Sequence, residues 1–345
     1  MAPIRRAFAA LGRELRKQRY SVLLFKNAFQ LMVDNFKLNY KLLLYKALVA
    51  VITVALGAAL LYAPLRGLFI SAPMDNLLAL FRDFFSAVTS GNTEFLSTFA
   101  EQLQGCITAL LAHLQENVPN IVLFFTGLIV VTLVSRFLDG IGNYTFGCLI
   151  DGRLSSYASE PFAVTCIANL GRSTLWQVIY VPVTFVYDLL ALALCYLLFL
   201  VLLSVIQISF LASVAALLFS VALLLAAQAV KLTLFNDVIP CLVTEKMRLR
   251  DALKAAFRFS RQKFGTLFST YLVTAVLILC VNVLFGLASF GAALLITIPM
   301  SYLMLICIQF VSYYHFGKKK YFLAEDVIVL PKERTQENFY DDFEV

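Results

Sequence analysis

Apolar residues dominate six long stretches of the chain between Ala47 and Phe316. A helix needs about 20 apolar residues to cross the ~30 Å hydrocarbon core of a bilayer. Each stretch is long enough, so the pattern predicts an all-α, polytopic membrane protein with six transmembrane helices. We expect the spans at about 47–66, 119–138, 177–203, 207–230, 266–288 and 292–315.

Polar residues separate these stretches in two ways. Ser204, Gln207 and Ser209 interrupt an apolar run that is too long for one span, and they predict a tight hairpin between the third and fourth spans. Residues 67–118 instead place apolar side chains at helical spacing, which predicts an amphipathic helical hairpin between the first two spans. This hairpin either packs against the spans or acts as a gating or partner-binding cap.

An internal repeat is the second organising feature. Lys26, Ala28 and Phe29 match Lys254, Ala256 and Phe257 at an offset of 228 residues, and a fainter third copy runs over 162–176. Each copy is an amphipathic segment that leads into a span. The chain therefore has a possible threefold repeat, in which each unit is an interfacial helix followed by a helical hairpin.

Charge predicts the orientation of these spans. Ten Lys and Arg residues lie in 1–46 and eight in 231–263, whereas 67–118 holds one Arg and five acids. Because basic residues near span ends remain in the cytoplasm, we expect both termini there. We predict three regions in a bacterial cytoplasmic (plasma) membrane protein. They are basic cytoplasmic or interfacial helices (1–46), a six-span domain (47–316) and an acidic cytoplasmic tail (317–345).

Asp188 is the acidic residue that the pattern places deep within a span. A carboxylate at this depth must pair, face the bundle interior or be protonated. The antiparallel hairpin brings Gln228 and Ser220 within about two turns of it, and Thr184 precedes it by one turn. Further polar candidates in the last two spans are Asn282 and Gln309. This set is either a proton- or cation-coupling site or structural hydrogen bonding between helices.

Catalytic chemistry is not expected. The seven cysteines are scattered without CxxC spacing, His113 lies in the outer loop and His315 at the inner end of the sixth span, so we predict no metal and no cofactor. A nucleotide-binding loop is also absent from the sequence. We therefore predict that the protein is not an enzyme and does not bind nucleic acid.

A basic segment precedes the fifth span and mixes cations with apolar residues, which is typical of a helix lying among anionic lipid headgroups. Its cations are Arg248, Arg250, Lys254, Arg258, Arg261 and Lys263. The expected partners are thus membrane lipids, together with a possible protein partner at the outer hairpin or the tail.

The stretch 231–290 also contains three segments that are similar to those of a known group of membrane proteins. Its segments Val238-Ile239-Pro240-Cys241-Leu242-Val243, Leu249-Arg250-Asp251-Ala252-Leu253-Lys254 and Phe257-Arg258-Phe259-Ser260 resemble a bacterial six-transmembrane family. That family includes the membrane domain of glycerophosphoryl diester phosphodiesterases and related uncharacterised stand-alone proteins. The resemblance implies a six-helix bundle with interfacial helices. It does not imply diesterase activity, because the soluble catalytic domain is absent from this sequence.

Taken together, these patterns predict a non-enzymatic integral membrane protein, an accessory or scaffold that engages lipid or a protein partner. The alternative is a small-solute or ion transporter that uses Asp188.

Overall fold

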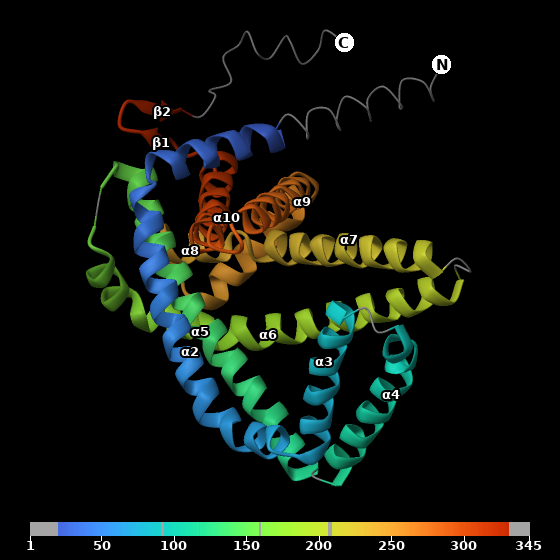
Figure 1. Ribbon diagram of the computed structural model, residues 1–345. Helices are drawn as coiled ribbons and strands as arrows, with labels where there is room; N and C mark the ends of the chain where they lie inside the picture. Colours follow the sequence, from blue (N-terminus) through green and yellow to red (C-terminus); the bar gives the residue numbers. More distant parts are fainter. Residues whose placement is uncertain (1–19, 91–92, 117, 159, 206–208, 331–345) are drawn as a thin grey trace, which may run out of the picture. The chain divides into compact units, whose positions relative to one another are not determined.

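The computed structural model describes residues 20–90, 93–116, 118–158, 160–205 and 209–330. Within these ranges the fold is all-α apart from one small β-hairpin, and six helices are long and apolar enough to cross a membrane. These helices are α2 (Lys37–Phe69), α5 (Val118–Ser156), α6 (Phe162–Val205), α7 (Ser209–Phe235), α9 (Leu249–Ala288) and α10 (Leu294–Phe316) (Figure 1). The prediction of an all-α polytopic membrane protein is confirmed.

Several of these helices are longer than the predicted spans. The third span was expected to begin at about 177 and the fifth at about 266, but α6 begins at Phe162 and α9 at Leu249. The basic or polar segment ahead of each span is helical too and continues into it. The second span was expected to end near 138, whereas α5 continues to Ser156.

The chain forms two compact units. The first contains residues 1–47 and 137–345, and the second contains 48–136. In the first unit, α7 packs along both α6 and α9 (Figure 1). α10 is the most enclosed span, since 44% of its most apolar window is buried, compared with 6–11% for the other five. Those five helices expose apolar side chains outward, as a lipid-facing surface requires.

The second unit contains α3 (Ala72–Ser90) and α4 (Thr93–Glu116), which form the predicted amphipathic hairpin. Phe84 and Phe99 face each other across it with ring centroids 4.4 Å apart, and Phe81 adds a second ring contact to Phe99 at 6.1 Å. Within the same unit, a Cβ built on Gly127 would be 2.8 Å from the Leu61 side chain. Glycine therefore allows α2 and α5 to approach closely.

A β-hairpin follows α10 and was not predicted from the sequence. It pairs β1 (Tyr321–Ala324) with β2 (Val327–Val329) in antiparallel fashion. The Tyr321 hydroxyl is buried and accepts a hydrogen bond of 2.9 Å from Asn27 Nδ2. The first half of the predicted acidic tail is therefore joined to the N-terminal helical segment 20–34, while 331–345 lies outside the described residues.

The structure supports two copies of the repeat. The N-terminal helix breaks at Asn35 and Phe36, and α9 has a non-helical residue at Lys263, which is 228 positions after Asn35. On both sides of these breaks, pairs of residues 228 positions apart are buried in both copies. The pairs are Leu24 and Ala252, Ala28 and Ala256, Met32 and Ser260, Leu38 and Thr266, and Leu42 and Thr270. In the region of the third copy, α6 continues without a break.

Candidate functional site

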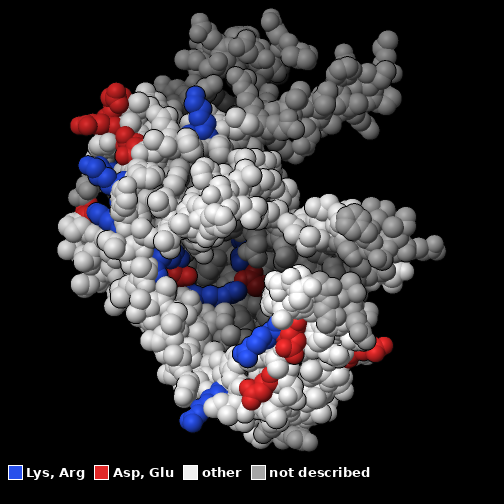
Figure 2. All heavy atoms as spheres, in the orientation of Figure 1, with Lys and Arg blue, Asp and Glu red and all other residues white. Residues whose placement is uncertain are grey.

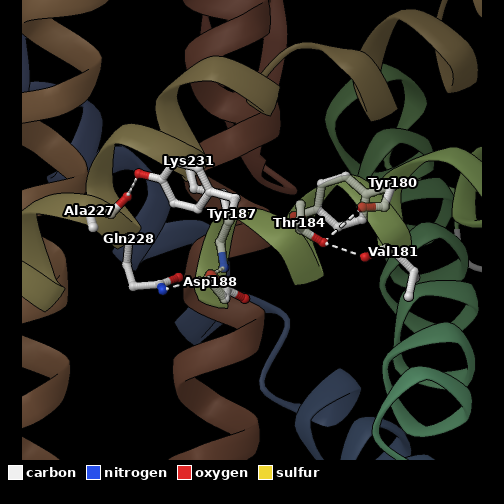
Figure 3. A network of polar contacts seen from close by, with 8 residues as sticks. All are labelled: Tyr180, Val181, Thr184, Tyr187, Asp188, Ala227, Gln228 and Lys231. Atoms are coloured by element: carbon white, nitrogen blue, oxygen red, sulfur yellow. Dashed lines mark hydrogen bonds and ion pairs between the residues drawn. The ribbon is translucent and has the colours of Figure 1, made fainter. Parts of the chain in front are cut away.

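Asp188 lies on α6 and faces two polar side chains of α7 (Figure 3). Its Oδ1 accepts a hydrogen bond of 3.1 Å from Gln228 Nε2 and forms an ion pair of 2.8 Å with Lys231 Nζ. Each partner of the ion pair exposes 13% of its side chain. The contact with Gln228 agrees with the position expected from the antiparallel hairpin.

The position of Lys231 differs from the one that the sequence predicted. We counted it with the basic segment that follows the fourth span, but α7 continues to Phe235 and places Lys231 within the helix. Asp188 therefore has an oppositely charged partner on the neighbouring helix. Such a pair offsets much of the cost of removing each charge from water.

Thr184 and Ser220 lie on the same two helices and make other contacts. The Thr184 hydroxyl donates to the Tyr180 carbonyl of its own helix at 2.8 Å (Figure 3). The Ser220 hydroxyl is buried and has no hydrogen-bond partner in the described part of the chain, while its carbonyl accepts from Cys195 Sγ at 3.7 Å.

Asn282 and Gln309 belong to two further places in the first unit. Asn282 of α9 accepts from the Thr297 hydroxyl at 2.6 Å and donates to Ser301 Oγ at 3.1 Å, so it joins α9 to α10. Gln309 of α10 donates to the Phe235 carbonyl at 3.5 Å, at the end of α7. The six predicted polar residues therefore do not form one cluster.

A polar cluster that the sequence analysis missed lies where α7 ends. Asn236 and Asp237 separate α7 from the short helix α8 (Val238–Val243). Asn236 donates to Asp237 Oδ1 at 2.6 Å and to Ser312 Oγ at 3.0 Å, and it accepts from the Tyr271 hydroxyl. Asp237 is 1% exposed. The signal in the sequence was the pair Asn-Asp followed by Pro240, which indicates a helix break within an otherwise apolar region.

The basic segment of α9 has one buried and one exposed face. Ala252, Ala256 and Ser260 are fully buried against the rest of the first unit. The predicted headgroup contacts are all exposed: Arg248, Arg250, Lys254, Arg258, Arg261 and Lys263. Arg248 is the N-cap of α9, and Lys263 lies at the break with its Nζ 5.3 Å from the centroid of the Phe316 ring. On the side of the molecule drawn in Figure 2, most of the surface carries neither Lys and Arg nor Asp and Glu.

A second group of polar contacts joins the ends of α5, α8 and α10. Asp151 accepts from the Thr244 hydroxyl at 2.6 Å and from the Tyr314 hydroxyl at 2.8 Å. Glu245 accepts from the Tyr313 hydroxyl and forms an ion pair of 3.0 Å with Lys319. The donated hydrogen bond from Tyr313, together with the Lys319 charge, lowers the pKa of the Glu245 carboxyl below its ordinary value.

Among the described residues, no set of three or more His, Cys, Asp or Glu side chains is placed to hold a metal ion. All seven cysteines are free thiols. Comparison of the chain with protein-family models, with curated proteins and with solved structures finds no match.

Proposed function

We propose that this protein is a non-enzymatic membrane accessory or scaffold protein that engages anionic lipid headgroups through the basic segment of α9. One observation carries the proposal. Six cations in and just before the first part of α9 are exposed, while Ala252, Ala256 and Ser260 of the same segment are buried in the first unit. The break at Lys263 then separates this segment from the apolar remainder of α9.

The physical basis is electrostatic. A Lys or Arg near an anionic leaflet gains about 1 kcal/mol from the surface potential, and the gain adds over a cluster. The long side chains can extend their charged ends to the headgroups while their stems cover apolar surface. We propose that this segment lies at the cytoplasmic leaflet of a bacterial cell membrane, with both termini on the same side, as the distribution of basic residues predicts.

The test compares two pairs of substitutions that each remove two positive charges. Lys254→Gln with Arg258→Gln changes the basic segment, and Arg66→Gln with Arg82→Gln changes exposed arginines of the second unit. Mass spectrometry measures the ratio of phosphatidylglycerol to phosphatidylcholine that copurifies from mixed vesicles. At about 1 kcal/mol per cation, the first pair lowers enrichment by roughly 30-fold and the second changes it little. Equal enrichment in wild type and both variants contradicts the proposal.

A transporter that uses Asp188 is the second candidate function. The observation in its favour is that Asp188, Gln228 and Lys231 gather polar groups between two helices of membrane-spanning length. The direct ion pair with Lys231 favours a structural role instead. Asp188→Asn discriminates the two: loss of a proton- or cation-dependent flux in vesicles, with the fold retained, supports transport.

The resemblance to the bacterial six-transmembrane family stays a prediction. We propose membership because the break at Lys263 and the exposed cations occur within 231–290, where the resembling segments lie. A protein partner at the amphipathic hairpin α3–α4 or at the tail likewise stays a proposal.

A further inference from the structure

The break between α7 and α8 places a carboxyl group in the core of the first unit. Asp237 occupies the last position before α8 and has a bridge-region conformation, with φ −93° and ψ 0°. Tyr271 and Ser260 of α9 and Ser312 of α10, which are all buried, lie around the break. Interrupted transmembrane helices are where membrane proteins commonly bind ions and protons.

The two oxygens of this carboxyl group have different surroundings. Oδ1 accepts the hydrogen bond from Asn236. Oδ2 is buried and has no hydrogen-bond partner of normal geometry in the described part of the chain. The hydroxyl of Ser260 lies next to the carboxyl group but donates to the Leu234 carbonyl at 3.4 Å.

No neighbouring group among the described residues is placed to neutralise a charge on Asp237. The titratable side chains that interact with it are the Cys241 thiol of α8 and the Tyr271 phenol of α9. Tyr180 of α6 lies beyond Tyr271, and Tyr313 of α10 lies beyond Cys241. Glu245 and Lys319, which also lie near Cys241, pair with each other at 3.0 Å. The ammonium group of Lys231 is engaged by Asp188. Arg258 and Arg261 of α9 are exposed, and the Lys263 ammonium group lies 5.3 Å from the centroid of the Phe316 ring.

An ionised carboxylate in this position would lose its hydration without gaining a counter-ion, which costs several kcal/mol. A neutral carboxylic acid has an O–H group that can donate. If the proton is on Oδ2, the hydroxyl of Ser260 can accept from it while still donating to Leu234. Every polar atom of the chain Asp237, Ser260 and Leu234 then has a partner.

We propose that Asp237 is a proton-binding site, and that it holds a proton on Oδ2 in the folded protein at neutral pH. The proton comes from water, and its release returns it to water and leaves a buried anion. Release therefore weakens the packing of the α7–α8 break against α9 and α10. This inference goes beyond the proposed lipid function and does not depend on it.

Asp237→Asn in the full-length protein tests the proposal, since Asn is similar in shape, remains neutral and can donate a hydrogen bond. Infrared spectroscopy in detergent should show a C=O stretching band of a protonated carboxylic acid in wild type that the variant lacks. Thermal unfolding between pH 6 and pH 9 should show a melting temperature that falls with rising pH in wild type and falls less in the variant.

Asp188→Asn is the matched control, because it removes a carboxylate that has a cationic partner. It should lower the melting temperature at every pH and keep the wild-type infrared band. A wild type that lacks the band at pH 7 contradicts the proposal, whether or not Asp237→Asn folds. Stabilisation of wild type by Na⁺ relative to choline, absent from Asp237→Asn, also contradicts it, because Asp237 would then bind a metal cation instead of a proton.

Discussion

Asp188 and Asp237 have largely buried carboxyl groups with different surroundings. Asp188 and Lys231 are each 87% buried by side chain, yet they lie 2.8 Å apart and Gln228 adds a hydrogen bond. The pair neutralises itself, so it suits a helix–helix contact better than a site that must exchange its ligand. Asp237 is the opposite case, a buried carboxyl group without a cation among its described neighbours.

Breaking the Asp188–Lys231 pair from one side should be costly. We expect Lys231→Met to destabilise the protein by about 3–5 kcal/mol, because it leaves a buried carboxylate uncompensated. The double variant Lys231→Met with Asp188→Asn should recover most of that loss. Thermal unfolding in detergent provides the measurement. If the double variant is as unstable as the sum of the single variants, the two side chains are not coupled.

Glu245 should make the fold sensitive to acid. Its pKa is lowered from 4.5 in the folded protein, so the ionised form is stabilised by folding. The resulting stabilisation is present at neutral pH and is lost as the pH falls below about 4.5 and through the lowered value. Glu245→Gln should therefore be less stable than wild type at pH 7, and the difference should shrink as the pH falls below about 4.5. A difference that is constant with pH would contradict this assignment.

The sequence predicted some of these residue contacts and missed others for physical reasons. Hairpin geometry alone placed Gln228 near Asp188, because antiparallel helices with a short connection have a fixed register. Lys231 was assigned to a loop because a cation at the end of an apolar run has the same pattern as a span boundary. The contacts of Asn282 and Gln309 depend on how distant helices pack, which periodicity does not determine.

Contacts between helices depend on glycine at specific positions. A Cβ built on Gly142 of α5 would lie 2.2 Å from Tyr45 Cε1. The Tyr45 hydroxyl donates to the Leu138 carbonyl of the same helix at 2.5 Å, so its ring is fixed across Gly142. Only glycine lets the two helices come this close.

Gly142→Ala should therefore destabilise the first unit by about 1–3 kcal/mol, the usual cost of overpacking. Gly171→Ala on α6 is the matched control, because a Cβ there meets nothing within 4 Å. Alanine favours helices over glycine by about 1 kcal/mol, so the control should be as stable as wild type or more stable. Comparison of the two melting temperatures tests the contact, and equal effects would contradict it.

Element boundaries were the least predictable part of the fold. Hydrophobicity shows where a helix can contact lipid, and it does not show where the helix begins. The basic segment of α9 and the polar start of α6 are helical because one face of each is buried in the first unit, as at Ala252, Ala256 and Trp176. The break at Lys263 separates the basic segment of α9, which has one buried face, from the apolar remainder of the helix.

For the molecule as a whole, composition and periodicity were sufficient to predict the class of fold. Six apolar stretches predicted six membrane-spanning helices, and the described residues contain six helices that are long and apolar enough to cross a membrane. The division into two units was not predictable. The boundaries near Ala47 and Phe137 coincide with the expected start of the first span and the expected end of the second, but α2 and α5 continue through them without interruption.

Labelling of single cysteines reveals on which side of the membrane each connecting segment of the chain lies. The seven native cysteines are replaced, and one cysteine is introduced at Ser90, Lys246 or Lys318. In intact cells, a maleimide that cannot cross the membrane should label Ser90→Cys but neither Lys246→Cys nor Lys318→Cys until the cells are permeabilised. Labelling of Lys246→Cys in intact cells, or recovery of the protein in the soluble fraction, would contradict the six-span account.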